Sequence, residues 1–348
     1  MPESAGMEPV PGTPPPFLNK VMHSTLDPAT VAALVGECYD VGRISECHLL
    51  RRGFNDVYEV KTEKTGCFVL RLSGSRLRRR SNVEYETSFL EHLDRSGVPV
   101  AAPIQTTTGR LWASVIAPEG ERTAVLFRYV PGRAAQRGSK PDAAAQGETL
   151  ARIHLAGRTF QAPGKPPPLD EDGLLVQPTK AVRSRPFVEH GTAAAVEELV
   201  SRLIERLHEA RGSLAWGHCH GDCHGLNARI TQTGPLRRLA TFFDFDDGGP
   251  GWLAYDLAVY LWNKALNPET LDLWPSFLEG YRSVHAISEA DLDAILLFVP
   301  IRHVWLVGQY ASKLREWGTE TVPQPWFRSQ LDFIARWEER HLSPGRLL

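Results

Sequence analysis

The centre of the chain holds carboxylates and an amide at spacings that suit phosphate chemistry. Asp222 is followed five residues later by Asn227, and Asp244 stands after an apolar stretch. A metal-dependent phosphoryl transfer needs one carboxylate to orient a hydroxyl and further oxygen groups to hold Mg²⁺ on the nucleotide. Asp and Asn are also frequent turn residues, so this spacing alone is weak evidence. Combined with the elements that precede it, the order of these residues predicts a kinase-like site.

The same stretch supports a second interpretation, a metal centre. Potential zinc ligands are crowded here, namely His218, Cys219, His220, Cys223 and His224. Structural zinc sites usually draw four ligands from two separated pairs, and the sequence offers no second pair. We therefore expect these thiols to pack within a phosphoryl-transfer loop rather than to bind zinc.

The composition is that of a soluble globular protein with room for two lobes. The chain has 348 residues, of which 42% are hydrophobic and 23% are charged. Its net charge of −2 gives no basic excess for a nucleic-acid partner. No run approaches the ~20 apolar residues of a membrane span. The five cysteines are odd in number and follow no apolar signal peptide, so we expect free thiols and a cytoplasmic location.

The first part of the chain predicts a small antiparallel sheet. Residues 1–25 are rich in proline and are expected to form a flexible tail. Residues 26–131 are expected to form an N-terminal nucleotide-binding lobe of short alternating strands. One helix interrupts them, because apolar residues form a stripe between positions 83 and 93. The expected strands are 48–50, 56–61, 67–72, 111–116 and 123–130.

Helical periodicity dominates residues 132–348, which we expect to form a larger catalytic and acceptor-binding lobe. The expected helices are 143–155, 193–210, 252–264, 269–284, 289–310 and 327–341. Short strands surround the Asp222 loop. The predicted fold class is therefore α+β, with an N-terminal antiparallel sheet and one helix before a mostly helical C-terminal lobe.

Three motifs resemble those of one known family. They are the loop from His220 to Asn227, the run Asp244-Phe245-Asp246-Asp247, and the run Tyr255-Asp256-Leu257-Ala258. Over roughly residues 45–310 the chain resembles the aminoglycoside phosphotransferase and choline kinase-like group of small-molecule kinases. The resemblance implies a two-lobe protein-kinase-like fold, ATP or GTP as phosphoryl donor, Mg²⁺ as cofactor and a small hydroxylated molecule as acceptor.

Taken residue by residue, the resemblance implies that Asp222 is the catalytic base or hydroxyl-orienting group. Asn227 would be a Mg²⁺ ligand with a neutral oxygen, and Asp244 would be the main ligand with the anionic oxygen that a hard cation prefers. His220 would brace the loop by hydrogen bonding, and Asp256 would anchor the helix that follows.

One departure from the family concerns the nucleotide-binding cation. The family usually has a lysine on the third strand, where this sequence has Arg71. Its planar guanidinium can still contact phosphate, but the geometry differs from that of an ammonium group. Glu86 is the best match for the helix carboxylate that would pair with Arg71. The alternative is that Glu86 is an ordinary exposed helix residue.

A second departure concerns the phosphate loop, which is poor in glycine. Only Gly53 stands beside Phe54 and Asn55, so the cradle would depend on this turn and on backbone N–H groups. A plain hairpin turn is the alternative. The adenine is expected to lie against Phe127 and Tyr129, at the end of the last strand of the first lobe.

The acceptor site is expected to contain Asp246, Asp247 and Trp252, with Trp262 and Trp305 as further candidates for its walls. Carboxylates and aromatic faces suit a cationic amino-alcohol, amino acid or amino-sugar. Two alternatives stay open. The carboxylates could instead cap the loop before the next helix, and the tryptophans could belong to the core.

Three functions fit the sequence. The leading one is an ATP-dependent O-phosphotransferase that acts on a small, cationic acceptor. The second is a Ser/Thr protein kinase of the bacterial stress-response type, which the chain resembles in its acidic motif at Asp244. The third is a nucleotide-binding scaffold without transfer, which the retention of Asp222 and Asn227 argues against. No long activation segment separates Asp244 from Trp252, and this favours a small acceptor.

Overall fold

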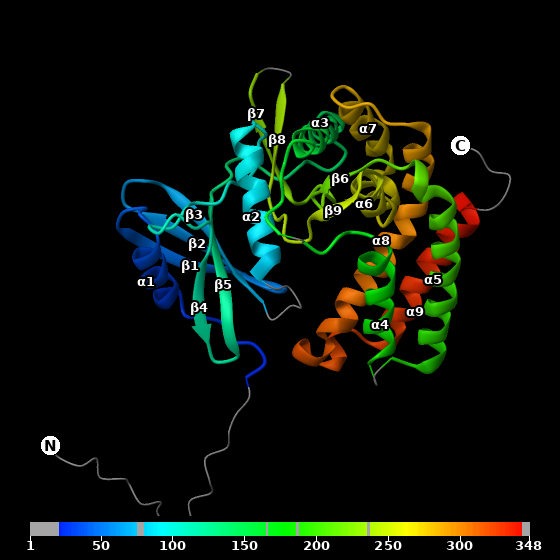
Figure 1. Cartoon of the computed structure of the whole chain (residues 1–348), viewed down its shortest axis with the longest axis horizontal. Coiled ribbons are helices and arrows are strands. Elements are labelled where there is room, and N and C mark those ends of the chain that lie inside the picture. Colours follow the sequence, from blue (N-terminus) through cyan, green and yellow to red (C-terminus); the bar gives the residue numbers. More distant parts are fainter. Residues whose placement is uncertain (1–20, 75–79, 165, 186–187, 235–236, 343–348) are drawn as a thin grey trace, which may run out of the picture.

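The chain folds into a sheet lobe and a helical lobe that lie side by side (Figure 1). The structure is a computed structural model that describes residues 21–74, 80–164, 166–185, 188–234 and 237–342. The predicted α+β class is confirmed, because an antiparallel sheet precedes a mostly helical remainder. Residues 1–20 of the predicted tail lie outside the described residues.

The first lobe is built on a five-stranded sheet in the order β1-β2-β3-β5-β4. Each neighbouring pair is antiparallel, as the alternating sequence pattern predicted. The alternation places Tyr58, Leu70 and Leu126 on one buried face. The strands are β1 (Ile44–Arg52), β2 (Asn55–Thr62), β3 (Cys67–Ser73), β4 (Ala113–Ala117) and β5 (Gly120–Arg128).

Two helices, rather than the one expected, accompany this sheet. The expected helix is α2 (Arg80–Arg95), which lies between the sheet and the second lobe (Figure 1). The additional helix is α1 (Pro28–Cys38), and its Val31 and Val35 pack into the core of the sheet lobe. Asp27 caps α1 by accepting a hydrogen bond from the N–H of Ala29 at 2.8 Å. Asp27 and Pro28 were start signals that could have predicted α1.

The predicted tail also ends earlier than expected. Ser24 donates its hydroxyl to Glu119 at 2.6 Å, and the ring of His23 lies 3.2 Å from Asp56. Residues 21–25 therefore belong to the contacts of the sheet lobe. These buried polar contacts bring together segments far apart in sequence, so no local pattern could reveal them.

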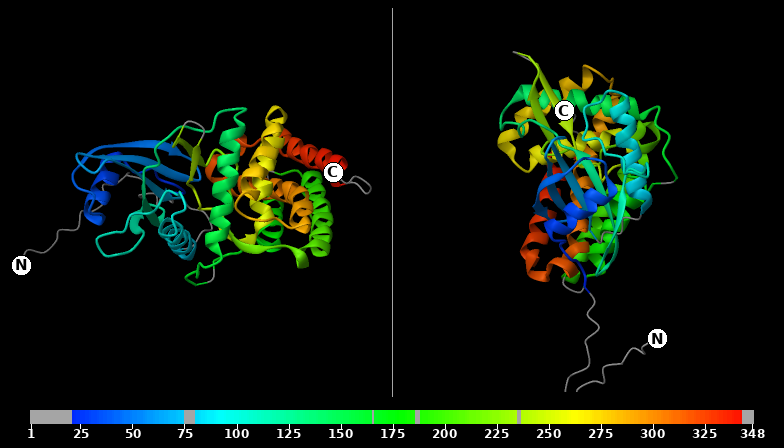
Figure 2. Two further views of the ribbon diagram at one scale, coloured as in Figure 1. Left: turned by 90° about the horizontal axis from the view of Figure 1, so that it is seen from above. Right: turned by 90° about the vertical axis from the view of Figure 1, so that its left-hand side faces the viewer.

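Helices form most of the second lobe, and Figure 2 shows them packed beside the sheet lobe from two further directions. The expected helices are present with shifted ends, and the predicted segment 269–284 begins with a short 3-10 turn, Pro268–Leu273. The α-helices are α3 (Lys140–Gly157), α4 (Gln177–Arg183), α5 (His190–Ala210), α6 (Leu253–Ala265), α7 (Trp274–Arg282), α8 (Glu289–Trp317) and α9 (Gln324–Trp337).

Two small ladders frame the Asp222 loop. One pairs β6 (Trp216–Cys219) with β9 (Gly249–Trp252), and the other pairs β7 (Ala228–Gln232) with β8 (Arg238–Phe242). Both pairs are antiparallel. The loop therefore leaves β6 and enters β7, and its two ends are fixed by hydrogen-bonded strands.

Helix α8 is longer than the sequence pattern indicated. It begins after Ser288, whose hydroxyl accepts the N–H of Asp291 at 3.0 Å, and it continues to Trp317 instead of ending near residue 310. Gly318 ends it with φ of 95°, a left-handed conformation that glycine adopts readily. Across the described residues, no helix is long and apolar enough to cross a membrane.

Close packing of α3 against α7 depends on two glycines. A Cβ on Gly280 would lie 2.0 Å from the carbonyl oxygen of Ala144, and a Cβ on Gly147 would lie 1.9 Å from that of Phe277. Both distances are shorter than real Cβ contacts allow. The two backbones can approach this closely only because neither residue has a side chain.

We expect Gly280→Ala to lower the free energy of unfolding by about 1–3 kcal/mol, because the new methyl group must push α3 and α7 apart. The matched control is Gly191→Ala in α5, where an added Cβ meets nothing within 4 Å. That change should be neutral or slightly stabilising. Urea unfolding of both variants measures the difference, and equal stabilities would contradict the packing argument.

Candidate active site

The Asp222 loop is held in place by one buried carboxylate. Asp256, in the first turn of α6, accepts the backbone N–H of His220 at 2.7 Å and that of Gly221 at 2.8 Å. His154 of α3 lies 2.9 Å from the same carboxylate, and the hydroxyl of Tyr281 lies 2.8 Å from the other nitrogen of that ring. Asp256 was expected to anchor its own helix, but its hydrogen bonds anchor the loop.

His220 braces the loop as the sequence analysis predicted. Its Nδ1 accepts the backbone N–H of Asp222 at 3.2 Å, so its Nε2 carries the proton and donates to the carbonyl of Phe243 at 3.2 Å. Burial lowers the pKa of His220, which keeps the ring neutral in this arrangement. The ring therefore joins the loop to the strand end that precedes Asp244.

The Asp222 carboxylate is surrounded by hydrogen-bond donors. Asn227 donates its side-chain amide to Asp222 Oδ2 at 2.9 Å, and His224 Nε2 lies 3.4 Å from the same oxygen. Arg302 of α8 binds Oδ1. Burial alone would raise the pKa of Asp222, but the charge of Arg302, with help from His224, lowers it to about 2. Asp222 is therefore ionised. Arg302 was not among the expected site residues, because it lies 80 residues from Asp222 in the sequence.

Asp244 has the opposite electrostatic situation. Burial and the neighbouring carboxylates of Asp246, Asp222 and Asp247 together raise its pKa to about 8, against the charge of Arg71. A cluster of partly buried carboxylates is stabilised by a cation, and carboxylate and amide oxygens are the ligands that Mg²⁺ prefers. Its φ of 67° is the only left-handed value among the described non-glycine residues. Strain of this kind is typical of functional sites.

The backbone brings the segments of the two expected metal ligands, Asn227 and Asp244, close together. The N–H of Phe243 donates to the backbone carbonyl of Asn227 at 3.0 Å, which brings the residue before Asp244 against Asn227. The side-chain nitrogen of Asn227 is engaged with Asp222, so its oxygen is the atom that remains as a ligand. The donor set therefore fits a divalent metal ion.

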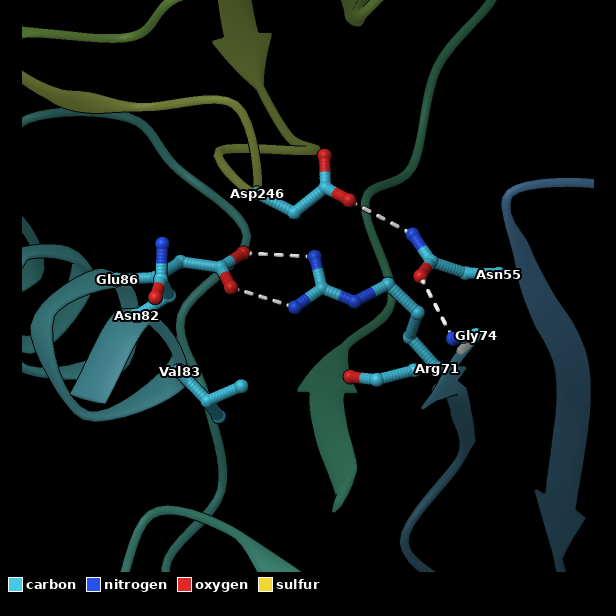
Figure 3. A pocket seen from close by; sticks show the side chains of 8 residues that line it. Asn55, Arg71, Gly74, Asn82, Val83, Glu86 and Asp246 are labelled. Atoms are coloured by element: carbon cyan, nitrogen blue, oxygen red, sulfur yellow. Dashed lines mark hydrogen bonds and ion pairs between the residues drawn. The ribbon is translucent and has the colours of Figure 1, made fainter. Parts of the chain in front are cut away.

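The predicted ion pair between Arg71 and Glu86 is present. Two hydrogen bonds of 2.7 and 2.5 Å join the guanidinium of Arg71 in β3 to the carboxylate of Glu86 in α2 (Figure 3). Both side chains are buried, so Glu86 is not an exposed helix residue. Arg71 also lies 3.8 Å from Asp244 and 5.3 Å from the ring of Phe127. This arrangement places a cation beside the expected metal and phosphate positions.

The turn between β1 and β2 closes over this region. Asn55 donates to Asp246 Oδ2 at 2.8 Å and accepts the N–H of Gly74 at 3.2 Å (Figure 3). Phe54 points to α8, where its ring lies 6.1 Å from that of Tyr310 and 4.9 Å from that of Trp317. The predicted phosphate loop is therefore in contact with the helical lobe through both residues after Gly53.

A small pocket lies where these groups meet, and Figure 3 shows its lining side chains. It is lined by Asn55, Arg71, Ser73, Gly74, Asn82, Val83, Glu86 and Asp246. Phe127 lies beside it, beneath Arg71, whereas Tyr129 follows the end of β5 and is 45% exposed. The predicted nucleotide residues thus come from one region between the lobes, and their binding roles remain predictions.

The structure places the predicted acceptor residues in different environments. Asp246 lines the pocket with Asn55, and Asp247 is buried near Arg302. Trp252 was expected at the acceptor site, but it is only 7% exposed and its ring packs against Trp216 and Phe298. The core alternative therefore holds for Trp252, because β9 turns its side chain toward α8.

The cluster of potential zinc ligands is dispersed among other contacts. Cys219 donates to the carbonyl of Trp252, Cys223 donates to that of Asp256, and His218 lies 2.9 Å from the hydroxyl of Tyr85. Burial raises the pKa of both thiols well above the usual value, which disfavours the thiolate that zinc requires. Within the described part of the chain, the free cysteines behave as packing residues.

Comparison with known proteins shows the family of the chain. The sequence profile described as the phosphotransferase enzyme family matches residues 47–293. The chain belongs to this family. A protein from Deinococcus radiodurans is 38% identical to this phosphotransferase over 92% of each chain. A serine/threonine protein kinase named RdoA, from Salmonella typhimurium, is 28% identical over 84% of this chain and 85% of its own.

Solved structures share the fold of this phosphotransferase. Amicoumacin kinase hAmiN, in a complex with AMP-PNP, Ca²⁺ and amicoumacin, superimposes with a TM-score of 0.75 at 21% identity, over 92% of this chain and 96% of its own. A microcompartment-associated aminopropanol kinase gives a TM-score of 0.70 at 23% identity, over 90% of this chain and 97% of its own. The expected protein-kinase-like fold is thereby confirmed.

The metal-ligand assignment predicts unequal losses. Asp244→Ala should reduce Mg²⁺-dependent nucleotide binding by more than the roughly 10- to 100-fold typical of losing a supporting residue, and Asn227→Ala should reduce it less. Titration of Mg²⁺ against nucleotide affinity measures both. The control is Asp94→Ala, which removes a partly exposed α2 carboxylate paired with Arg128. Equal losses, or none for Asp244→Ala, would contradict the assignment.

Variants of the Arg71–Glu86 ion pair can separate its effect on ATP binding from its effect on stability. Arg71→Ala should weaken ATP binding strongly, and it should also cost about 3–5 kcal/mol of stability because Glu86 would be left buried and unpaired. The double variant Arg71→Met with Glu86→Leu should recover much of the stability but not the ATP affinity. Calorimetry of unfolding and of ATP binding tests both effects, and normal ATP binding by the double variant would refute the role of Arg71.

Proposed function

We propose that the protein is an ATP-dependent O-phosphotransferase that moves the γ-phosphate to a hydroxyl of a small acceptor with a positive charge. The observation that carries the proposal is the hydrogen bond from Asn227 to the carboxylate of Asp222, in the same cluster of polar groups as Asp244. An anionic hydrogen-bond acceptor next to two oxygen ligands is the arrangement that in-line transfer from Mg²⁺-ATP to a hydroxyl requires.

Each group has a chemical task in this proposal. Asn227 and Asp244 would hold Mg²⁺, which neutralises charge on the ATP phosphates when it is bound. Arg71, kept in place by Glu86, faces the phosphates as a fixed cation. Asp222 accepts the hydrogen bond of the acceptor hydroxyl and orients its oxygen toward the phosphorus. Its low pKa suits orientation, with proton transfer to the carboxylate late in the reaction.

The excess of carboxylates supports a cationic acceptor. Asp222, Asp244, Asp246 and Asp247 surround the site, and their mutual repulsion is evident in the raised pKa of Asp244. A Mg²⁺ ion held by Asn227 and Asp244 would neutralise only part of this charge, so an ammonium group on the acceptor would be favoured. Amino-alcohols, amino acids and aminoglycosides belong to this chemical class.

A protein acceptor is the second candidate, because the RdoA relative is named a serine/threonine protein kinase. One feature argues for the small acceptor. Only the short β9 strand separates the Asp244 motif from α6. Protein kinases build a peptide-docking surface from a long segment at this position, and this chain has no room for one there.

A screen of acceptors with radiolabelled ATP and Mg²⁺ tests the proposal. The panel contains amino-alcohols, aminoglycosides, homoserine-like amino acids, uncharged alcohols matched to the amines in size, and casein. We expect phosphorylated product from a cationic small molecule, and a rate lower by roughly 10²- to 10⁴-fold for Asp222→Asn, which retains ATP binding. Product from casein alone would favour the protein kinase. A wild-type transfer rate no higher than that of Asp222→Asn would exclude a phosphotransferase that acts through Asp222.

A further inference from the structure

Arg302 is a buried cation directly beneath the catalytic loop. It stands in the middle of α8 and is 3% exposed. Its Nη2 donates to Asp222 Oδ1, and its Nη1 donates to the carbonyl of Gly221 at 3.1 Å and to the hydroxyl of Tyr255 at 3.2 Å. One guanidinium thus contacts the backbone of the loop and the carboxylate that the loop presents.

Two of the tryptophans considered as pocket walls hold this guanidinium. Arg302 lies 4.2 Å from the ring centre of Trp305 and 5.1 Å from that of Trp262. The indole N–H of Trp262 donates to His303 at 2.9 Å, which fixes its ring. The planar cation is therefore confined by aromatic faces, a geometry that arginine satisfies and lysine does not.

Stability alone does not explain the buried ion pair between Arg302 and Asp222. Burying a charged pair costs desolvation energy that apolar side chains of similar size avoid, and replacing such pairs by apolar residues is often neutral or stabilising. The guanidinium instead points its donors at Asp222, on the side opposite the contacts of Asn227 and His224.

We propose that Arg302 is a positioning residue that holds the Asp222 carboxylate in the orientation from which it receives the acceptor hydroxyl. The inference rests on the proposed function. Arg302 occupies Oδ1, so Oδ2 is the oxygen presented beside Asn227 and the metal ligands. Without Arg302 the carboxylate rotates about its Cα–Cβ and Cβ–Cγ bonds, and misplacement by about 1 Å can cost roughly 10²-fold in rate.

The test measures ADP release with the best acceptor of the screen and, separately, with water alone. Arg302→Ala should lower kcat by roughly 100-fold while KM for ATP stays unchanged, because the nucleotide contacts are elsewhere. Millimolar guanidinium chloride should restore kcat several-fold by entering the vacated site, and NaCl at equal ionic strength should not. Arg302→Lys keeps the charge but not the paired donors, so its kcat should be intermediate.

The matched control is Arg133→Met, which removes another arginine bound to a buried carboxylate, Asp142, at 2.6 and 3.0 Å. It should lower the melting temperature but leave kcat unchanged. Wild-type kcat in a folded Arg302→Ala variant would overturn the positioning role. The role would also be overturned if, in both Arg302→Ala and Arg302→Lys, kcat fell in proportion to the melting temperature and guanidinium did not restore it. No wild-type turnover with any acceptor or with water would overturn the proposed function itself.

Discussion

The site depends first on the buried carboxylate of Asp256. Two backbone N–H groups of the Asp222 loop and the ring of His154 converge on it, so that it joins three segments that are distant in sequence. Burial would raise its pKa, but hydrogen bonds from His154 and the charges nearby lower it, so the group stays ionised. A loop rich in glycine and polar residues has little apolar surface of its own, and this carboxylate supplies the fixed point from which Asp222 projects.

Charge balance links that loop to the rest of the site. The carboxylates around it are partly offset by two buried arginines from different lobes, Arg71 in β3 and Arg302 in α8. As a result, the pKa values of Asp222 and Asp244 are shifted in opposite directions. Asp222 is held strongly ionised, whereas Asp244 has a raised pKa that a divalent cation would reverse. This difference is consistent with the proposed roles, in which Asp222 orients the hydroxyl and Asp244 binds the metal ion.

Helix α8 connects the two halves of this arrangement. Its middle carries Arg302 under the catalytic loop, and its last turns carry Tyr310 and Trp317 against Phe54 of the β1–β2 turn. Asn55 of the same turn reaches Asp246. The nucleotide turn, which lacks a glycine-rich run, is therefore supported by aromatic packing and by hydrogen bonding to the second lobe. A rigid element that touches both sites keeps the expected ATP and acceptor positions in register.

Sequence alone determined the residues whose chemistry depends on local spacing. The separation of Asp222 from Asn227 and the motif at Asp244 are local patterns within single loops. The pairing of Arg71 with Glu86 was expected from the family resemblance, because these residues belong to two different elements, β3 and α2. Tertiary structure decided what depends on long-range contacts. Arg302 stands 80 residues from Asp222, in a helix that is apolar on most sides, so periodicity could not show what it faces. Trp252 looked like a pocket wall until β9 placed its ring in the core, because only the packed chain fixes which face of an element meets the site.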